Sequence, residues 1–443
     1  MPAFLRTMLI LGCLLTLPGA QGATEHAPVL RVQGSNTLGA QLVPALLRAM
    51  LKQRGLAQVR QEVTGNTNEQ WVLADSAPGR TLRFEIDAHG TRTGFTALAE
   101  GRADLAAASR PIAPGERDRL AALGDMTSPE AEHVIGIDGV AVIVHPANPL
   151  HAITLEQLAQ VFSGDVNRWE QLGAGSGPIH LYTRDDQSGT WETFRERVLA
   201  PYQASLAAQA KRLESSELLS RLVSQDPDAI GFIGLPYVLK ARALAIGDGL
   251  ASPITPGVGV IATEDYPLAR RLYFYLPPAS ANQWAAALLA FTQSPQGQAI
   301  VAAQGFVAQT VQAMAVHPTL NMPPAYRALA QRAQRLSVNF RFAEGSAILD
   351  NKAQADIERV VAFLQAHGRL QGHTTLVGLG DPKSEPERAA LLSRLRALAV
   401  GRELARHGVT LYQVLGLGDQ LPVADNRVDT GRKRNRRVEV WLE

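Results

Sequence analysis

Residues 182–191 read YTRDDQSGTW, a stretch in which an arginine stands four residues ahead of a Ser-Gly-Thr turn that opens an amphipathic helix. The first N–H groups of a helix have no partner within the helix, and they carry partial positive charge. Ser188, Gly189 and Thr190 can therefore offer amide and hydroxyl donors to one anion, while Arg184 supplies a full charge. The alternative is an ordinary N-cap, for which serine and threonine are usual residues. Other helix starts of the same kind would favour the anion site.

Two other segments have the same order of strand, polar turn and helix. Leu30 and Val32 alternate as in a strand and lead into the turn GSNT at 34–37, and a second alternating run leads into the turn HGTRTG at 89–94. Neither turn matches a dinucleotide-binding fingerprint or a Walker loop. The helix after the first turn has an apolar face made of Leu38, Leu42, Val43, Leu46, Leu47, Met50 and Leu51. The strand before the second turn has Leu82, Phe84 and Ile86, and Phe95 and Leu98 begin the apolar face of the helix after it. Three such turns together predict an anion site.

Longer stretches around these turns resemble the periplasmic phosphate-binding proteins (PstS-like) that deliver phosphate to ABC importers. The resemblance rests on GSNTLG (34–39), ADLAAASRPI (103–112), IDGVAVIVHPANPL (137–150), LEQLAQVFSGDVNRW (155–169), RDDQSGTW (184–191), AIGFIGLPYV (229–238), TEDYPLARRLYFY (263–275) and SPQGQAIVAAQGFV (294–307). It implies an α/β, bilobal type II periplasmic-binding-protein fold over roughly residues 27–312, whose lobes close over a dehydrated anion.

The same resemblance implies a set of ligand donors for phosphate or a similar tetrahedral oxyanion. The donors are Ser35, Asn36, Thr37, Thr91, Thr93, Ser109, Arg184, Ser188, Gly189 and Thr190. Phosphate-binding members often have an aspartate after the serine that corresponds to Ser109, where it can accept the proton of hydrogen phosphate, but this chain has Arg110. A site made only of donors would tolerate sulfate as well as phosphate, unless Asp138, Asp185 or Asp186 supplies the acceptor. We read Arg92, inside the second turn, as a surface arginine.

The N-terminus has the pattern of a secretory signal peptide, which we assign to residues 1–22. Arg6 precedes an apolar run from Met8 to Leu17 that is too short to span a membrane, and small residues end the segment at Gly22. Cys13, the single cysteine, lies in a stretch that loosely resembles a lipoprotein acylation box, so lipidation is an alternative. Apolar residues continue after Cys13, whereas a polar tether normally follows a lipidated cysteine. We therefore expect an exported periplasmic protein without disulfides.

Composition and motifs exclude several classes of function. The formal net charge of +2 over 443 residues implies no general attraction to nucleic acid. The chain has no GxSxG nucleophile elbow and no HExxH motif, and its histidines are scattered singly. The paired acids Asp185 and Asp186 could serve acid–base chemistry, but their position favours orienting Arg184 through Asp186. The sequence therefore predicts no enzyme, no metal site and no cofactor.

A second domain follows a proline-rich interruption. Pro318, Pro323 and Pro324 break the pattern around a short helical segment, so we assign residues 313–335 to a linker and 336–443 to a small α+β domain. The expected order is βαβαβ. The expected elements are a strand with Val338, Phe340 and Phe342; a helix over 350–367 with Ile357, Val360, Val361 and Leu364; a strand over 374–379; a helix from Pro386 to Gly408 packed through Leu391, Leu392, Leu395, Leu398 and Leu404; and a strand with Val438, Val440 and Leu442.

This domain resembles the OmpA-like peptidoglycan-binding domain through LSRLRALAV (392–400), GLGDQLPVADN (416–426) and GRKRNRRVEV (431–440). The resemblance implies that Asp381 and Arg396, fifteen residues apart, hold the ammonium and carboxylate of diaminopimelate. Asn426, Asn435 and Arg437 are implied as supporting residues. The chain departs from the family at Leu379-Gly380, where His-Thr is usual, and at Arg388-Ala389, where Tyr-Asn is common. We read Arg432-Lys433-Arg434 as a solvated basic surface.

The two resemblances lead to one function and one alternative. The protein would bind phosphate or a similar oxyanion as the receptor of an ABC importer, with an importer permease as partner, and would be anchored non-covalently to peptidoglycan, near the outer membrane. The alternative is a wall-anchored anion sensor or envelope scaffold that takes no part in transport. An extended linker of about twenty residues, at roughly 3.3 Å each, would not cross a whole periplasm, which favours a local role.

Overall fold

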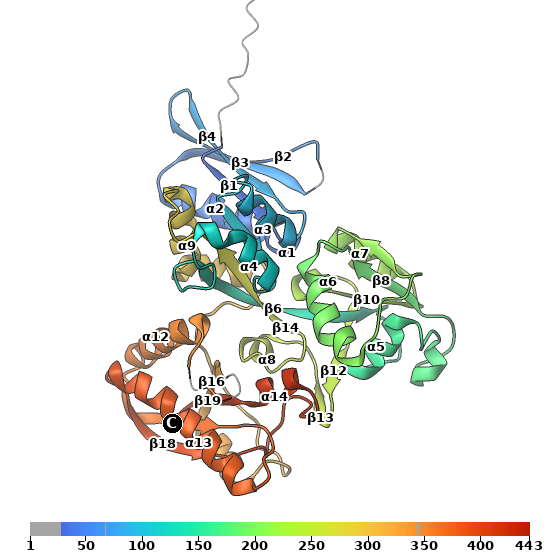
Figure 1. The fold of residues 1–443 in the computed structure, drawn as a ribbon, viewed down its shortest axis with the longest axis vertical. Coiled ribbons are helices and arrows are strands. Elements are labelled where there is room, and N and C mark those ends of the chain that lie inside the picture. The colour runs from blue at the N-terminus through green and yellow to red at the C-terminus, as the bar shows by residue number, and fades with distance from the viewer. Residues whose placement is uncertain (1–27, 67, 343–344, 347) are drawn as a thin grey trace, which may run out of the picture.

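The computed structural model describes residues 28–66, 68–342, 345–346 and 348–443. The predicted signal peptide and Cys13 lie outside the described residues. Two lobes form the N-terminal domain, and the C-terminal domain lies beneath both of them in Figure 1. The described residues therefore form a two-lobed α/β part and a smaller α+β part, in agreement with the predicted fold class.

The first lobe is built on strand–turn–helix units. Its elements are β1 (Leu30–Gly34), α1 (Asn36–Gly39), α2 (Leu42–Gln53), β2 (Ala57–Val63), β3 (Glu69–Ala77), β4 (Arg80–Asp87), α3 (Thr91–Ala99), β5 (Leu105–Ala108), α4 (Pro114–Leu120), β14 (Ala269–Tyr275), α9 (Gln283–Gln293) and α10 (Pro295–Ala303), with a 3₁₀ turn at Ala121–Leu123. β1 pairs in parallel with both β4 and β5. The predicted apolar face of α2 is confirmed, because its leucines and Met50 are buried in the core.

The second lobe continues the same sheet through β6 (Glu132–Val144). The first part of β6 pairs with β14 and the last part pairs with β10. The lobe contains β7 (Ala152–Thr154), α5 (Leu155–Ser163), β8 (His180–Arg184), α6 (Gly189–Phe194), β9 (Lys211–Leu213), α7 (Ser216–Gln225), β10 (Ala229–Gly234), β11 (Arg242–Ala243), β12 (Ala245–Asp248), β13 (Ala251–Ile254) and α8 (Val258–Ala262), a π-helical turn at Arg195–Leu199, and 3₁₀ turns at Trp169–Leu172, Ala200–Tyr202 and Leu235–Tyr237. β6 therefore joins the lobes, and the chain returns to the first lobe at β14.

Within the described residues, the C-terminal domain has two strands and two helices more than the predicted βαβαβ order. Its elements are β15 (Ala313–Met314), α11 (Pro324–Arg332), β16 (Gln334–Arg341), α12 (Asn351–Ala366), β17 (Gln371–Gly378), α13 (Pro386–Arg406), β18 (Thr410–Gly416), α14 (Asp429–Asn435) and β19 (Arg437–Leu442). The strands lie in the order β15-β16-β19-β17-β18. β18 is an edge strand in which every residue is exposed or only half-buried, so its sequence has little of the alternation that identifies a strand.

The predicted packing face of α13 is wrong at Leu391, Leu395 and Leu398, whereas Leu404 is buried as predicted. Leu391, Leu395 and Leu398 are 57%, 49% and 40% exposed, whereas Ala389, Ser393, Ala397, Val400, Gly401 and Leu404 face the sheet. Two glycines explain the difference. A Cβ on Gly378 would lie 1.9 Å from the Ser393 carbonyl oxygen, and one on Gly416 would lie 2.4 Å from that of Ala390. Because the helix backbone lies directly against the strands, mostly small side chains fit between them.

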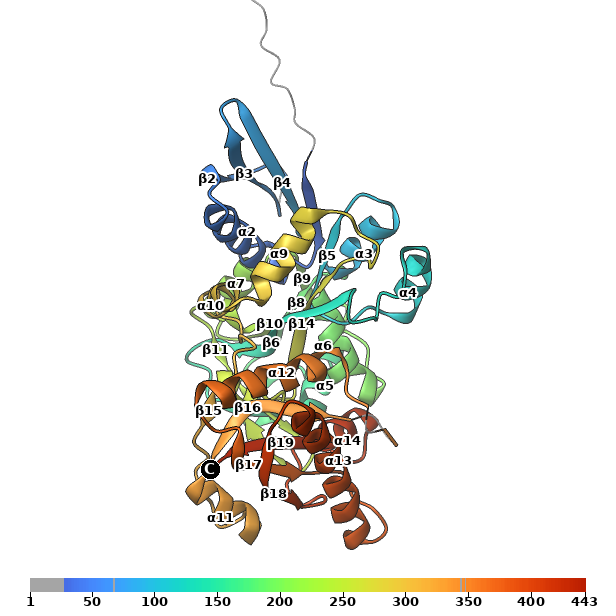
Figure 2. The same ribbon diagram turned by 90° about the vertical axis from the view of Figure 1, so that its left-hand side faces the viewer.

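The segment assigned to a linker, residues 313–335, is folded onto the C-terminal domain. β15 pairs with β16, and Tyr326 and Leu329 of α11 pack with Trp441 of β19. The Tyr326 hydroxyl donates to Glu439 at 2.9 Å. Figure 2 shows α11 at the end of the molecule farthest from the first lobe. The segment is thus part of a packed unit rather than an extended spacer.

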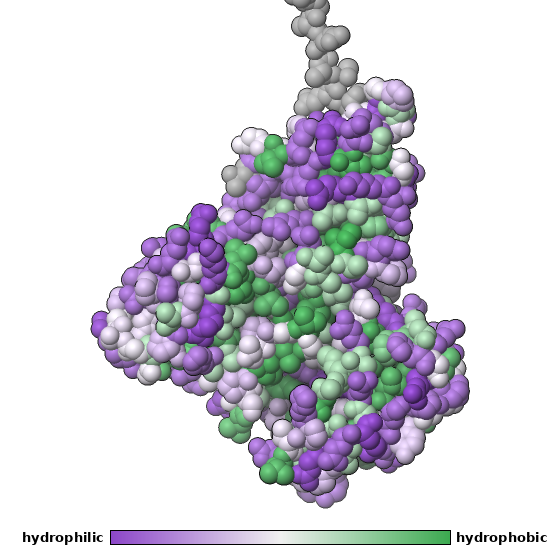
Figure 3. Space-filling model, turned by 180° about the vertical axis from the view of Figure 1, so that it is seen from behind, coloured by the Kyte–Doolittle hydropathy of each residue, from purple (hydrophilic) through white to green (hydrophobic). Residues whose placement is uncertain are grey.

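Buried ion pairs join the two domains. Asp265, which follows α8, accepts hydrogen bonds from Arg335 at 2.8 Å and Arg341 at 3.0 Å. Burial opposes ionisation of Asp265, but the guanidinium groups around it outweigh burial and hold its pKa below the usual value. Seen from behind, apolar surface gathers along the middle of the molecule, between polar outer margins (Figure 3).

The C-terminal domain contacts the N-terminal domain on both sides of the lobe junction. Near the first lobe, Asp350 pairs with Arg271 of β14 at 2.7 Å, and Asn351 donates to the Thr127 carbonyl at 2.9 Å. At the second lobe, Arg434 of α14 pairs with Asp248 of β12 at 2.6 Å. A change in the angle between the lobes would therefore change these contacts.

Candidate functional site

Five buried hydroxyl groups meet between the lobes. We call them the hydroxyl cluster: Ser35, Thr37, Thr91, Ser109 and Thr190, each at most 3% exposed. Ser35 follows β1, Ser109 follows β5, and Thr91 begins the helix after β4, whereas Thr190 belongs to α6 of the second lobe. Since β1, β4 and β5 are parallel, their carboxyl ends lie at one edge of the sheet. The sequence order strand, polar turn, helix produces this convergence.

The hydroxyl oxygens lie at hydrogen-bonding distances from one another. Ser109 Oγ is 3.2 Å from Ser35 Oγ and 3.3 Å from Thr91 Oγ1. Thr37 Oγ1 in the first lobe is 3.4 Å from Thr190 Oγ1 in the second. Hydroxyl groups can donate or accept, so the cluster can reorient its protons toward an anion.

Glycines let the second lobe approach the first. A Cβ on Gly189 would lie 2.4 Å from Ser109 Oγ and 2.5 Å from Thr91 Oγ1. Gly90 has φ +120°, and a Cβ there would lie 2.1 Å from the Gln187 carbonyl oxygen. Larger residues at either position would hold the lobes apart. The structure therefore has the two lobes closed on each other at the cluster.

Arg184 lies at the edge of the cluster, and acceptors of the chain surround its guanidinium. It donates to the carbonyl oxygens of Leu213 at 3.1 Å and Glu214 at 2.6 Å, to Ser216 Oγ at 2.7 Å, and to Asn36 Oδ1 at 3.5 Å. Burial lowers its pKa to about 10, so the group stays charged at neutral pH. Arg184 thus contacts Asn36, a predicted ligand of the first lobe.

The acids after Arg184 differ from the expectation. Asp186 does not orient Arg184, because it is exposed and pairs with Arg212 instead. Asp185 Oδ2 lies 3.8 Å from the Arg184 guanidinium, and its other oxygen accepts the Gln187 N–H. The turn uses Asp185 to shape the loop, so neither acid lies in the hydroxyl cluster.

Two predicted ligands have local partners. Ser188 caps α6, because its Oγ accepts the N–H groups of Thr190 at 3.2 Å and Trp191 at 3.5 Å. The N-cap alternative is therefore realised at this position. Thr93 donates to the Gly90 carbonyl at 2.8 Å at the start of α3 and is only half-buried. The structure does not bring Thr93 into the cluster.

Arg270 is a buried cation at the cluster that the sequence did not reveal. It stands in β14 opposite Asp138 of β6, and its Nε and Nη2 donate to Asp138 Oδ2 at 3.0 and 2.6 Å. Its Nη1 donates to Thr190 Oγ1 at 2.7 Å and its Nη2 to Thr37 Oγ1 at 3.3 Å. The available signal was a pair of arginines, Arg270 and Arg271, inside the otherwise apolar strand run LARRLYFY.

Arg110, at the position where an acid was expected, is directed away from the cluster. It makes a bidentate pair with Glu116 at 2.7 Å and also contacts Glu192. Burial opposes its charge, but the two acids outweigh burial and raise its pKa. The charge of Arg110 is therefore compensated by Glu116 and Glu192 and is not added to the hydroxyl cluster. Arg92 is 44% exposed at its side chain and pairs with the same Glu192.

In the C-terminal domain, Asp381 is paired with residues other than Arg396. Asp381, at the end of β17, is 2% exposed and pairs with Arg436 at 2.9 Å and Lys383 at 2.8 Å. Arg396 of α13 lies nearby, since a Cβ on Gly380 would be 3.4 Å from Arg396 Nη1. Burial opposes ionisation of Asp381, but hydrogen bonds from Arg436 and Lys383 lower its pKa to about 2. Asp381 is thus ionised and already paired with cations.

The supporting residues of this pocket act within the fold. Asn435 accepts the N–H groups of Val423 and Ala424, and its Nδ2 donates to Asn426 Oδ1 at 2.8 Å. Arg437 is 2% exposed and pairs with Glu439 at 3.1 Å. The structure places Arg436, rather than Arg437, beside Asp381.

A family model described as a PBP superfamily domain matches residues 63–296, more than half of the chain. This chain belongs to the PBP superfamily. Residues 341–436 match the OmpA family, so an OmpA domain follows the PBP domain.

Curated relatives and solved structures agree with this assignment. Protein SphX of Synechocystis is 28% identical over 224 residues, which are 48% of this chain and 65% of SphX, so the chain spans less than two thirds of that relative. Phosphate-binding protein PstS of Pseudomonas aeruginosa is 27% identical over 271 residues, 57% of this chain and 82% of the relative. A substrate-binding protein with bound phosphate from Clostridium perfringens has a TM-score of 0.51 at 22% identity, and the match covers 63% of this chain and 98% of that chain. This last likeness shows the fold alone.

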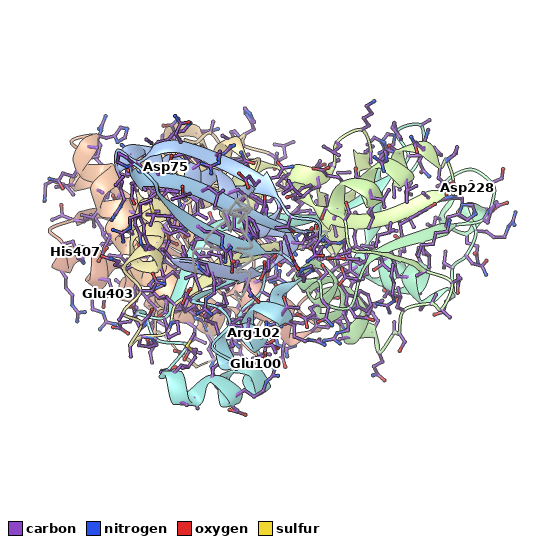
Figure 4. The ribbon with its side chains drawn as sticks, turned by 90° about the horizontal axis from the view of Figure 1, so that it is seen from above. Asp75, Glu100, Arg102, Asp228, Glu403 and His407 are labelled. Atoms are coloured by element: carbon purple, nitrogen blue, oxygen red, sulfur yellow. The ribbon has the colours of Figure 1, made fainter. Side chains whose placement is uncertain are left out.

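Outside the cluster, one group of metal-ligand side chains lies together within the described residues. His180, Asp226 and Asp228 have ligand atoms within 4.8 Å of one another. Asp228 lies at the outer end of the second lobe of the PBP domain (Figure 4). Asp226 already accepts from His180 at 2.8 Å and Tyr182 at 3.1 Å. In the part of the chain that the structure describes, no helix is long and apolar enough to cross a membrane.

Proposed function

We propose that the protein captures phosphate or a similar tetrahedral oxyanion at the hydroxyl cluster of its PBP domain. The observation that carries this proposal is the convergence of five buried hydroxyl groups from two lobes beside Arg184 and Arg270. Such donors, held away from water, suit an anion whose oxygens only accept. The names of the PstS relatives support phosphate as the ligand.

Calorimetry of the mature protein with phosphate, sulfate and arsenate at two pH values tests this proposal. Ser109→Ala and Arg184→Ala should each weaken binding about tenfold or more, because each removes a buried donor or charge. The matched control is Arg102→Ala, an arginine on the outer surface of the first lobe that pairs with exposed Glu100 (Figure 4). Unchanged affinity in both site variants would show that the anion binds elsewhere.

We further propose that the OmpA domain anchors the protein to peptidoglycan non-covalently through the pocket at Asp381. An acid beside cations at a strand end can bind the ammonium and carboxylate of diaminopimelate. Sedimentation with purified peptidoglycan should be lost in Asp381→Ala, whereas Glu403→Ala on the exposed face of α13 should sediment normally (Figure 4). Full binding by Asp381→Ala would exclude this pocket.

The captured anion could serve one of two functions of the protein. The first is that of a receptor which delivers the anion to an importer. The packing of residues 313–335 onto the OmpA domain favours the second, a wall-anchored sensor or scaffold, because it removes an extended tether. Growth of a deletion strain on limiting phosphate separates the two candidates. Normal uptake together with envelope defects would exclude the importer role, and lost uptake would support an ABC permease as partner.

A further inference from the structure

Arg270 is built into the strand that lies behind the hydroxyl cluster. Its side chain is buried, and the register of β14 and β6 places it directly opposite Asp138. Asp138 Oδ2 accepts both Nε and Nη2 of Arg270, and Oδ1 accepts the Leu235 N–H at 3.1 Å. The carboxylate therefore holds the guanidinium in one orientation, and both of its oxygens are already engaged.

The remaining donors of Arg270 reach one hydroxyl group in each lobe. Nη2 donates to Thr37 Oγ1 at 3.3 Å in the first lobe, and Nη1 donates to Thr190 Oγ1 at 2.7 Å in the second. A guanidinium has donors and no acceptor, so both hydroxyl protons must point away from it. A single rigid fork thus sets the direction of two hydroxyl groups across the lobe junction.

The charges separate the roles of the two buried arginines. Asp138 contacts Arg270 at 2.6 Å and neutralises its charge, whereas the Arg184 guanidinium lies 3.8 Å from the carboxylate of Asp185. The Arg270–Asp138 pair therefore adds orientation at the cluster without adding net charge, whereas the acceptors that hold Arg184 most closely are neutral oxygens.

We propose that Arg270 is a positioning residue of the anion site. It orients the hydroxyl groups of Thr37 and Thr190 so that both donate hydrogen bonds to a fully deprotonated oxyanion. This inference rests on the proposed function. The arrangement explains why the site would favour a fully ionised anion. Its hydroxyl groups donate, the charge of Arg110 is compensated by Glu116 and Glu192, and both oxygens of Asp138 already accept hydrogen bonds.

The test compares affinities for phosphate and sulfate by calorimetry at pH 5.5, where phosphate carries protons and sulfate does not. The Asp138→Asn/Arg270→Gln double variant replaces this ion pair by two amides, so the net charge of the pair stays zero and the side chains stay similar in size. We expect it to lose about tenfold or more in sulfate affinity and less in phosphate affinity, because the freed hydroxyl groups can accept the phosphate protons. Arg102→Gln is the control for loss of an arginine.

Thr190→Val completes a cycle with that double variant. Because Arg270 acts through this hydroxyl, the valine should cost clearly less affinity in the double variant than in the unaltered protein. Thermal melts establish that the variants fold. If the double variant does not fold, a comparison of Thr190→Ser with Thr190→Val replaces the cycle. Serine retains a hydroxyl group, so it should restore the sulfate affinity that valine removes. Three outcomes would overturn the inference. They are an unchanged ratio of sulfate to phosphate affinity in the double variant, additive losses of affinity from Thr190→Val and the double variant, and equal affinities of Thr190→Ser and Thr190→Val. Absence of binding by the unaltered protein would instead overturn the proposed function, and the inference with it.

Discussion

At the residue scale, His89 connects the lobes at the border of the anion site. Its Nε2 lies 3.2 Å from Glu69 in the first lobe and its Nδ1 lies 3.2 Å from Glu214 in the second. Burial opposes protonation, but the two acids outweigh burial and raise the pKa of His89 above 6.5. The bridge is complete when His89 is protonated, so it stabilises the closed lobes at low pH and is lost as pH rises through the raised pKa.

We therefore predict that the affinity for phosphate, divided by that of His89→Gln, falls as the pH rises from 6 to 9. The ratio removes the ionisation of phosphate itself, which both proteins experience equally. Calorimetry at four pH values measures it, and His407→Gln, an exposed histidine of the C-terminal domain, is the control (Figure 4). A ratio that does not change with pH would show that the bridge does not favour closure.

Lys383 provides a second prediction at this scale. Its ammonium contacts Asp381 at 2.8 Å, where the ammonium of a diaminopimelate ligand would also bind. We predict that Lys383→Ala increases the fraction of protein that sediments with peptidoglycan, because the ligand no longer competes with the lysine. Lys240→Ala, an exposed lysine of the PBP domain, should have no effect. Weaker sedimentation of Lys383→Ala would mean that Lys383 supports the pocket instead of blocking it.

The hydroxyl cluster was predictable from sequence, and its cations were only partly so. Ser35, Thr91 and Ser109 follow the three mutually parallel strands β1, β4 and β5 of a mixed sheet, and this local order is visible in the chain. Arg270, by contrast, reaches the cluster through pairing of β14 with β6, more than a hundred residues earlier in the chain. Neither local periodicity nor turn chemistry reports such a pairing.

At the element scale, α13 depends on two glycines in the strands beneath it. We predict that Gly378→Ala destabilises the protein by about 1–3 kcal/mol, because the added methyl would lie 1.9 Å from the backbone of Ser393 and the helix must move. Urea unfolding measures the change. Gly115→Ala in α4, where a Cβ would meet nothing within 4 Å, should leave stability unchanged or slightly higher. Equal stability of the two variants would contradict the close packing.

The same packing explains why the helix was predictable and its buried face was not. Leucines at three-to-four spacing normally mark the face toward the core. Here the helix backbone lies so near Gly378 and Gly416 that alanine, serine and glycine occupy the contact. The apolar stripe of Leu391, Leu395 and Leu398 is consequently turned outward. Periodicity identifies a helix, but partner geometry decides which face is buried.

At the scale of the whole molecule, β14 faces both functional parts. Arg270 is directed to the hydroxyl cluster, whereas the next residue, Arg271, pairs with Glu264 and with Asp350 of the C-terminal domain. Successive side chains of a strand point to opposite faces, so one strand carries both contacts. The sequence predicted two domains but not their attachment, because the attachment depends on single charges such as Asp265 and Asp248 that resemble surface acids in the chain.

These contacts predict that the two domains unfold together. Asp265 compensates Arg335 and Arg341 at the junction, and removal of one partner from a buried ion pair costs about 3–5 kcal/mol. Scanning calorimetry of the unaltered protein should give one transition, and Asp265→Asn should give two, since the domains retain separate apolar cores. Asp228→Asn, at the outer end of the second lobe, should keep a single transition (Figure 4). Two transitions in the unaltered protein would mean that the junction does not couple the domains.

If the unaltered protein unfolds in one transition, phosphate should raise the melting temperature of the OmpA domain along with that of the PBP domain, because a ligand stabilises the whole cooperative unit that binds it.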